Sequence, residues 1–382
     1  MKPEQFTKKK TGRIVQLSGM GEATHAFIPD PLPAVWEWPT ELWPLLLEAH
    51  KALASLNGTG KHLPNASLVR RPLQNREALK SSSLEGTYTE PTQQALFDLD
   101  PKYPENATDP INARREVFNY TRALSHWKEA REKLPLSLRL IRRLHGILMD
   151  GVRGSDRNPG EFRRLQNQIG KPARFVPPPP QHLAESLDLF EKYIHAKRAF
   201  DPLVDAFIVH YQFEAIHPFM DGNGRVGRLL LAILIEEWCE LSDQWLYMSS
   251  YFDKNKDTYI DLLFRVGSEG LWKEWIEFCL KGVVETAHDT QKRCEQLVAL
   301  QQTFHNRLRK GPGSVRLTAI VDDLFKSPVI LPSRLAQTHN VTYPTARSDL
   351  RRLQAAGIVR AMPHTPQITY ICQKIIDITY AD

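Results

Sequence analysis

Apolar residues recur every three or four positions along most of this chain, and this spacing predicts a mainly α-helical protein. The amphipathic helices predicted in this way cover residues 40–56, 136–149, 183–195, 203–216, 247–264 and 272–288. The first of these should end at Asn57-Gly58-Thr59-Gly60, because glycine and asparagine favour helix ends. Residues 229–235 are wholly apolar and predict a further, buried helix.

Two segments depart from this helical pattern. Residues 1–37 contain closely spaced prolines, which prevent regular helix, and we expect them to lie as an extended arm across the body of the protein. Residues 166–176 predict a short β-hairpin that turns at residues 170–172. Four consecutive prolines, residues 177–180, then predict a stiff extended connector.

The C-terminal residues have a different order of predicted elements. A polar amphipathic helix at residues 290–308, ending near residues 310–313, should link the body of the protein to a small domain that starts at residue 314. In order, that domain has a turn at His339-Asn340, a helix at 344–356, and short strands at 358–361 and 368–372 around a wing at 363–366. This order resembles a winged helix-turn-helix, for which DNA binding and protein docking are both open.

Composition narrows the class of protein. Charged residues make up 25% of the 382 residues and hydrophobic residues 42%, which are ordinary proportions for a globular protein. The net charge of +6 permits an anionic partner without requiring one. The four cysteines form no Cys-x-x-Cys pair, which argues against a zinc site and a disulfide framework. No apolar run approaches the ~20 residues that span a bilayer, so we expect a cytoplasmic protein without a membrane partner.

Residues 217–228 contain the densest group of potentially catalytic and ligand-binding side chains in the sequence. They read His-Pro-Phe-Met-Asp-Gly-Asn-Gly-Arg-Val-Gly-Arg. It places a histidine, a carboxylate, three glycines and two arginines where a loop enters the apolar helix. A loop at a helix N-terminus presents free N–H groups to an anion, and arginines add donors for phosphate oxygens. The stretch therefore predicts a nucleoside triphosphate site.

Three other interpretations of these residues fail. Residues 222–227 satisfy G-x-G-x-x-G, but a helical pattern precedes them where a dinucleotide fold needs a strand. A Walker A loop needs Lys-Ser/Thr where this chain has Arg228-Leu229. An EF-hand loop that starts at Asp221 would need an oxygen ligand in place of Arg225 and a glutamate in place of Ala232.

The stretch matches H-P-F-x-D-G-N-G-R-x-x-R in full, and on this motif the chain resembles the Fic (Fido) protein adenylyltransferases. The resemblance implies transfer of AMP from ATP to a Ser, Thr or Tyr hydroxyl of a target protein or of the protein itself. His217 would be the general base, Asp221 would hold Mg²⁺ between the α- and β-phosphates, and Phe219 would anchor the loop. The other motif residues implied to bind ATP are Gly222, Asn223 and Gly224 as an anion cradle, with the Asn223 amide on the α-phosphate, Gly227, Arg225 at the β-phosphate and Arg228 at the γ-phosphate.

A second stretch, Ser81-Ser82-Ser83-Leu84-Glu85-Gly86, is by itself a helix C-terminus with Gly86 in the C′ position. It also resembles the inhibitory pattern S/T-x-x-x-E-G/N of the same family, through Ser81, Glu85 and Gly86. The resemblance implies a salt bridge from Glu85 to Arg228, which would deny this arginine to the γ-phosphate. Removal of AMP from a modified target, the reverse activity, is also open.

The resemblance implies the fold as well: a Fic helical-bundle core with a small β-hairpin flap, in front of the α+β winged helix domain. Gln168, Ile169 and Gly170 of the flap would hold the target segment by strand addition, and Asn255 would line the adenine pocket. A homodimer is expected. The predicted divisions are an arm at 1–37, an N-terminal helical region with the inhibitory helix at 38–113, the catalytic core at 114–288, the linker helix at 289–313 and the winged helix at 314–382.

Two classes of function follow from the sequence. The first is an autoinhibited protein adenylyltransferase that uses ATP and Mg²⁺. The second is a DNA-binding transcriptional regulator whose Fic-type domain senses a nucleotide. Both need the nucleotide site, and only the second needs DNA binding by the C-terminal domain.

Overall fold

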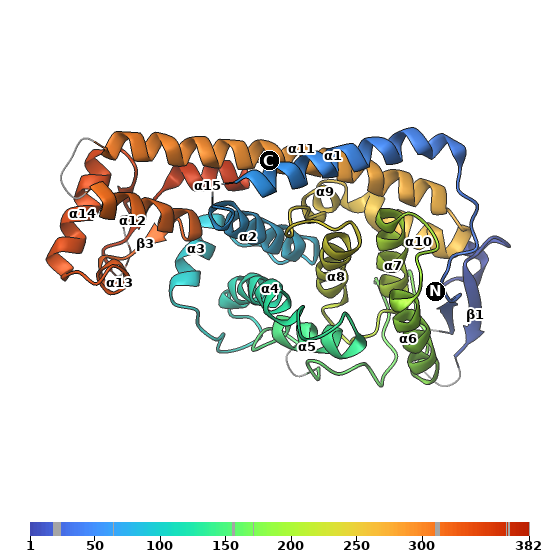
Figure 1. The fold of residues 1–382 in the computed structure, drawn as a ribbon. Coiled ribbons are helices and arrows are strands. Elements are labelled where there is room, and N and C mark those ends of the chain that lie inside the picture. Colours follow the sequence, from blue (N-terminus) through green and yellow to red (C-terminus); the bar gives the residue numbers. More distant parts are fainter. Residues whose placement is uncertain are drawn as a thin grey trace.

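The computed structural model describes residues 1–17, 24–63, 65–154, 157–170, 172–309, 314–363, 365 and 367–381. This part of the chain is mainly α-helical, as the sequence predicts, with short strands near both ends (Figure 1). The helices are α1 (Trp43–His62), α2 (Ser67–Leu84), α3 (Pro91–Leu99), α4 (Ile111–Ala130), α5 (Leu138–Leu148), α6 (Pro180–His195), α7 (Pro202–Ile216), α8 (Asn223–Trp238), α9 (Ser249–Lys254), α10 (Lys256–Glu269), α11 (Trp272–Leu308), α12 (Ser314–Lys326), α13 (Pro332–Thr338), α14 (Tyr343–Ala355) and α15 (Gln373–Tyr380). The strands are β1 (Gly12–Gln16), β2 (His25–Pro29), β3 (Val329–Ile330), β4 (Arg360–Ala361) and β5 (Tyr370–Ile371).

The centre of the protein is the pair α7 and α8, which pack along each other and are surrounded by α2, α5, α6 and α10 (Figure 1). Asp201 starts α7, because its carboxylate accepts the Leu203 N–H at 2.9 Å and Pro202 follows it in the first turn. Apolar side chains of both helices are almost wholly buried, which explains why residues 229–235 have no polar face. Since α7 ends and α8 begins in this core, the loop between them is held on a rigid base.

The first helix is longer than the sequence predicts. α1 continues to His62, through the Asn57–Gly60 segment that was expected to end it. A Cβ at Gly60 would overlap the indole ring of Trp245. The helix can therefore pack directly against this ring because residue 60 has no side chain. Tertiary packing here outweighs the low helix propensity of glycine.

The helix predicted at residues 272–288 and the linker helix predicted at 290–308 are one continuous helix, α11. It packs along α1 on one long edge of the molecule and also contacts α2, α9, α12 and α15 (Figure 1). Cys294, Leu297 and Phe304 are buried in this packing and form the apolar face of the amphipathic helix predicted there. Residues 310–313, where the linker was expected to end, lie outside the described residues.

The described residues of the arm, 1–17 and 24–37, are mostly extended apart from a short 3-10 helix at Pro3–Gln5, and they contain a two-stranded antiparallel sheet that the proline pattern did not indicate. Arg13 pairs with Ile28 and Ile14 with Phe27 in this β1–β2 sheet. The Phe27 N–H donates to the Val176 carbonyl at 2.8 Å, and its ring packs against Phe175. The arm is therefore fastened to the last two residues of the predicted flap.

The C-terminal residues 314–381 contain α12 to α15 and a three-stranded sheet in the order β3-β5-β4. Thr342 caps α14, with its hydroxyl accepting the Thr345 N–H, and Pro344 lies in the first turn as predicted. Two residues of the predicted wing, His364 and Pro366, lie outside the described residues. This region is not an isolated unit, because α12 and α15 both pack against α2.

A small second core joins the C-terminal residues to α3. Ala95 and Leu99 of α3 pack there with Val329, Ile371 and Ile376. Among the described helices, none has both the length and the apolar character that crossing a bilayer requires.

We expect Ile371→Ala to lower the free energy of unfolding by about 2–5 kcal/mol, because it opens a cavity at a fully buried position. Hydrogen–deuterium exchange should accelerate in α3 as well as in β5 and α15, since this core joins them. Ile368→Ala is the matched control, because Ile368 is exposed. Faster exchange confined to the C-terminal residues would contradict the shared core.

Candidate active site

His217 ends α7 in a left-handed conformation, with φ 49° and ψ 62°, so that its side chain leaves the helix axis. Its Nδ1 lies 3.3 Å from the Glu214 carbonyl oxygen, which can only accept a hydrogen bond. Nδ1 therefore carries the proton in the neutral ring, and Nε2 keeps a free lone pair. Burial and the nearby Arg163 guanidinium lower the pKa of His217 to about 4, so the ring is neutral at physiological pH.

Arg163 fixes the loop between α7 and α8 through hydrogen bonds to backbone carbonyl groups. Its backbone N–H donates to the Pro218 carbonyl at 2.9 Å, its Nε to the His217 carbonyl at 2.9 Å, and its Nη2 to the Pro178 carbonyl at 2.6 Å. Arg163 lies 54 residues from His217 along the chain, so the motif itself does not indicate this role. It ties the proline connector to the histidine.

Phe219 and Asn223 fix the loop internally. The Phe219 ring is fully buried and stacks on His145, with ring centroids 3.8 Å apart. The Asn223 side chain accepts the Phe219 N–H at 2.8 Å and donates to the Phe219 carbonyl at 2.9 Å. Because the side-chain amide of Asn223 is used in this way, its backbone N–H in the first turn of α8 is the group left to face a phosphate.

His145 of α5 also positions the motif. The Gly160 N–H donates to its Nδ1 at 2.8 Å, so its Nε2 carries the proton and donates to the Asp221 carbonyl at 3.0 Å. Burial lowers the pKa of His145 to about 4, which keeps this tautomer neutral. The Asp221 backbone is thereby held while its carboxylate, 37% exposed, faces solvent.

Arg225 is almost fully buried and pairs with a carboxylate that the sequence did not single out. Its Nη1 donates to Glu116 of α4 at 2.9 Å, and Thr87 donates to the same carboxylate oxygen at 3.0 Å. Glu116 has an exposed fraction of 1%, so it neutralises a buried charge. This pairing sets the direction of Arg225 before any ligand arrives.

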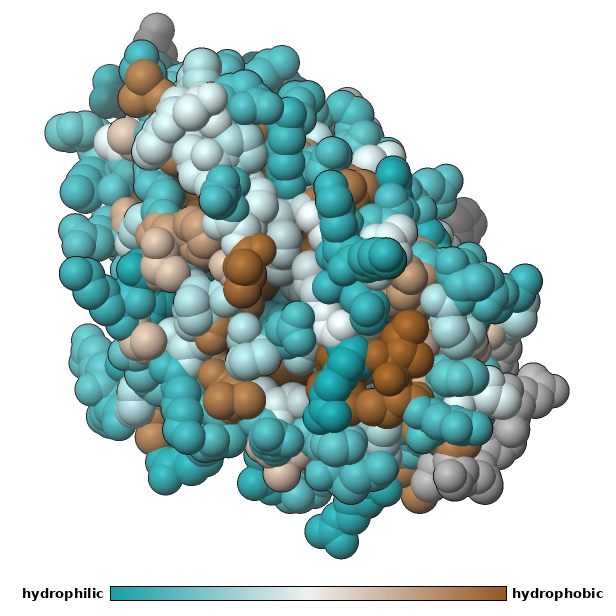
Figure 2. All heavy atoms as spheres, turned by 90° about the vertical axis from the view of Figure 1, so that its right-hand side faces the viewer, coloured by the Kyte–Doolittle hydropathy of each residue, from teal (hydrophilic) through white to brown (hydrophobic). Residues whose placement is uncertain are grey.

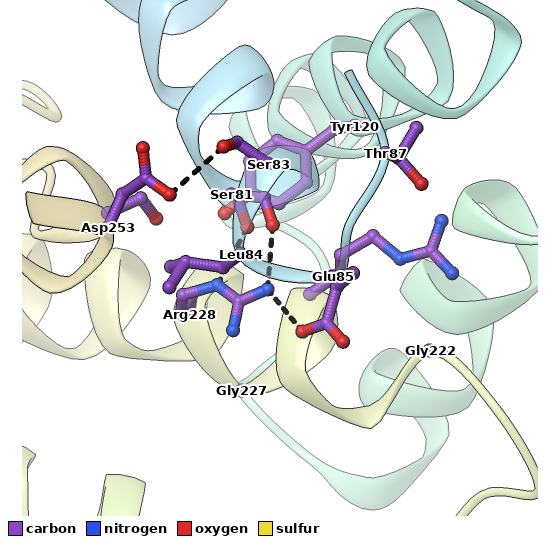
Figure 3. A network of polar contacts seen from close by, with 12 residues as sticks. Ser81, Ser83, Leu84, Glu85, Thr87, Tyr120, Gly222, Gly227, Arg228 and Asp253 are labelled. Carbon is purple, nitrogen blue, oxygen red and sulfur yellow. Dashed lines mark hydrogen bonds and ion pairs between the residues drawn. The ribbon is translucent and has the colours of Figure 1, made fainter. Parts of the chain in front are cut away.

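Arg228 is bound by the C-terminus of α2 (Figure 3). Its Nε donates to the Ser81 hydroxyl at 2.9 Å, and its Nη2 donates to the Ser81 carbonyl at 2.8 Å and to Glu85 at 2.7 Å. Gly86 follows with φ +79°, the left-handed C′ geometry that the sequence predicts. A Cβ at Gly224 would overlap the Glu85 carboxylate, so this glycine makes room for it.

The electrostatics of the Glu85–Arg228 pair favour its ionised form. Burial alone would raise the pKa of Glu85, but the Arg228 guanidinium and then Arg225 lower it below its ordinary 4.5. When the pKa of a carboxylate is lowered, its ion pair is fully formed at any pH above the ordinary pKa. The pair is lost only as the pH falls through the lowered pKa. The contact is therefore complete at neutral pH.

A cavity of about 210 Å³ adjoins His217, Glu85 and Arg228. Its other walls are mainly apolar and come from α7, α10 and the segment around residue 170; they include Ile169, Phe175, Tyr259, Ile260, Leu263 and Phe264. On the side of the molecule that carries β1, α6 and α10, hydrophobic side chains gather in a recess among hydrophilic ones (Figure 2). The cavity is smaller than the roughly 300–1,000 Å³ of typical ligand sites, in keeping with the space that Glu85 occupies.

The predicted flap is a tight turn with a single bridge, between Ile169 and Phe175, rather than two full strands. Gly170 adopts φ +85° at the turn, and Lys171 lies outside the described residues. Gln168 and Gly170 flank the bridge, and Ile169 lines the cavity. Asn255 is not among the residues that line this cavity; its amide donates to the Tyr251 carbonyl at 2.9 Å, and α10 contributes Tyr259 and the residues after it instead.

We expect the His217 ring to stay neutral until the pH falls to about 4, whereas an unperturbed histidine titrates near 6.5. NMR of protein with labelled histidine rings measures this titration directly and reports the tautomer, which should carry the proton on Nδ1. The signal is assigned by its loss in His217→Ala. Titration between pH 6 and 7 would show that the ring is not held in the desolvated position described.

Comparisons with known proteins agree with this geometry. Residues 135–235 match the Fic/DOC family, and residues 43–127 match the Fic/DOC family N-terminal region. A protein adenylyltransferase Fic of Drosophila grimshawi is 37% identical over 109 residues, which cover 27% of this chain and 21% of that relative. One of Aedes aegypti is 44% identical over 78 residues, which cover 20% of this chain and 15% of the relative. The chain thus matches about a fifth or less of the length of these curated relatives.

Solved structures extend the likeness beyond the motif. A Fic family protein from Desulfovibrio desulfuricans G20 aligns over 88% of this chain and 97% of its own, with a TM-score of 0.57 and 19% identity. Fic-1 from C. elegans aligns over 69% of this chain and 74% of its own, with a TM-score of 0.51 and 18% identity. At these identities the likeness shows the fold. By sequence, the likeness to the Fic/DOC family lies in residues 135–235, and the likeness to its N-terminal region lies in residues 43–127.

Proposed function

We propose that this protein is an autoinhibited adenylyltransferase, which transfers AMP from ATP to a Ser, Thr or Tyr hydroxyl of a target protein or of itself. The observation that carries the proposal is the position of a neutral His217 beside the N-terminus of α8 and Arg228, at one end of a largely apolar cavity. The names of the relatives matched over the Fic/DOC domain support the same activity. Removal of AMP by the same site stays a prediction from the sequence.

The reaction would be a substitution at the α-phosphorus of ATP. The hydroxyl oxygen of the target forms a bond to this phosphorus, the bond from phosphorus to the bridging oxygen breaks, and pyrophosphate leaves. Nε2 of His217 takes the hydroxyl proton, since its Nδ1 is committed to the Glu214 carbonyl. A positioned general base of this kind contributes roughly 10²–10⁴ in rate.

The first turn of α8 would hold the phosphates. The N–H groups of Asn223, Gly224 and Arg225 open the helix, have no intrahelical partner and lie at the positive end of its dipole. Arg225 would reach the β-phosphate from its pair with Glu116, and Arg228 would reach the γ-phosphate once Glu85 has left it. Little more than positioning and charge stabilisation is needed for displacement at phosphorus.

The residues present fit Mg²⁺. This ion is usually held by one or two carboxylates together with phosphate oxygens, and the exposed Asp221 carboxylate supplies the first of these beside the α8 N-terminus. When bound, Mg²⁺ would neutralise charge on the phosphates. In the described part of the chain no cluster of three or more His, Cys, Asp or Glu side chains is arranged for a metal, which suits an ion that arrives with ATP.

The flap and the C-terminal residues are the two regions that would contact other molecules. The turn at Gln168, Ile169 and Gly170 would align the target segment through backbone hydrogen bonds, which tolerate varied target sequences. The element order of residues 314–381 supports a winged helix, with α14 as its second helix of the helix-turn-helix. DNA binding, a homodimer and a cytoplasmic location stay predictions from the sequence.

We expect Glu85→Gly to raise AMP incorporation from labelled ATP at least tenfold, because it frees Arg228 for the γ-phosphate; a coupling of about 1.4 kcal/mol suffices for this change. The same variant with His217→Ala should lose incorporation while it still binds ATP. Glu90→Gly is the matched control, since Glu90 is exposed and lies just beyond the contact. Equal incorporation by the native protein and Glu85→Gly would contradict autoinhibition by Glu85.

A further inference from the structure

Glu214 is a carboxylic acid with an unused hydrogen-bonding atom in the wall of the cavity. Its Oε1 is buried and has no hydrogen-bond partner among the described residues, although the residue lines the cavity beside His217. Buried polar atoms nearly always have a partner, so an exception next to a cavity indicates a group that a ligand completes. Neither the motif nor the general-base step uses this carboxyl group.

The neighbours of Glu214 do not satisfy it. The Arg228 guanidinium, whose charge acts on Glu214, donates through Nε and Nη2 to Ser81 and Glu85. A Cβ at Gly227 would overlap Glu214 Oε1, so the absence of a side chain at residue 227 provides the space in which the carboxyl lies. Burial raises the pKa of Glu214 to about 7, and both its neutral and its ionised form can accept a hydrogen bond.

The position of Glu214 along α7 indicates which part of a nucleotide it would meet. Tyr211, Glu214 and His217 all line the cavity and follow one another at three-residue intervals, about 4.5 Å of helix rise apart. If the α-phosphate lies beside His217, the ribose comes next and the base lies furthest along, among apolar side chains such as Leu263 and Phe264. Glu214 is therefore level with the ribose, whose hydroxyl groups are donors.

We propose that Glu214 accepts a hydrogen bond from a ribose hydroxyl of the bound nucleotide and so selects ribonucleotides over deoxyribonucleotides. This inference rests on the proposed function, because it takes the orientation of the nucleotide from the His217 end of the cavity. Acidic side chains recognise ribose hydroxyls in the same manner in unrelated dinucleotide-binding folds. The alternative is that Glu214 serves as a second internal partner for Arg228, in which case it would affect all nucleotides equally.

The test compares nucleotide affinities in the Glu85→Gly background, with Mg²⁺ present. Calorimetry gives the Kd of ATP, 2′-deoxy-ATP and 3′-deoxy-ATP without requiring turnover. We expect ATP to bind at least tenfold tighter than one of the two analogues, and that analogue identifies the hydroxyl. Glu214→Ala should reduce this preference to less than about threefold, whereas Glu214→Gln, which keeps an acceptor oxygen, should retain part of it.

Glu237→Ala is the control, because this exposed glutamate lies on α8 away from the cavity and its removal should leave the preference unchanged. A preference that survives Glu214→Ala, or equal affinity for all three nucleotides before that change, would overturn the ribose assignment alone. If the protein binds the nucleotides but transfers no AMP, the proposed function is refuted. The ribose assignment is then tested by the Kd values alone. Absence of binding by any nucleotide would overturn both.

Discussion

Arg228 has an exposed fraction of 4%, and a guanidinium group at such a depth needs a counter-charge as well as acceptors for its N–H groups. The C-terminus of α2 provides both, through the Ser81 hydroxyl, the Ser81 carbonyl and the Glu85 carboxylate. Removing Glu85 without a replacement leaves the buried Arg228 charge without its carboxylate partner, and this costs free energy even though the Glu85 side chain is 38% exposed. A phosphate group carries the same sign of charge and the same kind of acceptor oxygens as this carboxylate, and the proposed autoinhibition rests on this equivalence.

The position of α2 is itself fixed by buried polar contacts on several sides. Glu77 accepts hydrogen bonds from Tyr120 of α4 at 2.9 Å and from Ser249 of α9 at 2.5 Å. Close to the inhibitory end, Lys256 donates to the Leu84 carbonyl at 2.7 Å. α12 and α15 pack against the same helix, so the C-terminal residues also support it. Glu85 is consequently held by a helix that belongs to the core rather than by a mobile segment.

The chemistry of residues 217–228 could be predicted because the residues that form the loop and the start of the helix follow one another in the sequence. Their supporting residues could not be predicted. Glu116 lies on α4, His145 on α5 and Arg163 between α5 and the flap, and each gains its role only when its segment packs against the loop. Glu214 lies close to the motif but resembles any glutamate of a helix, since only the missing Cβ of Gly227 shows where its carboxyl fits.

The same distinction applies to the fold. Helices such as α5, α6 and α7 followed from periodicity, whereas α2, α3 and α4 were not predicted in this way. The continuation of α1 through Gly60 and the fusion of two predicted helices into α11 depend on contacts with distant residues. The β1–β2 sheet was missed because the proline pattern of the arm indicates extended backbone without indicating its pairing partner.

If Glu85 and the γ-phosphate compete for Arg228, ATP and ADP should respond differently to the loss of Glu85, because the two nucleotides differ only in that phosphate. Calorimetric affinities should be similar for both nucleotides in the native protein, where Glu85 occupies the guanidinium. In Glu85→Gly, ATP should bind at least tenfold tighter than ADP, while the affinity for ADP changes little. An equal gain for both nucleotides would contradict the competition and assign Glu85 a different role.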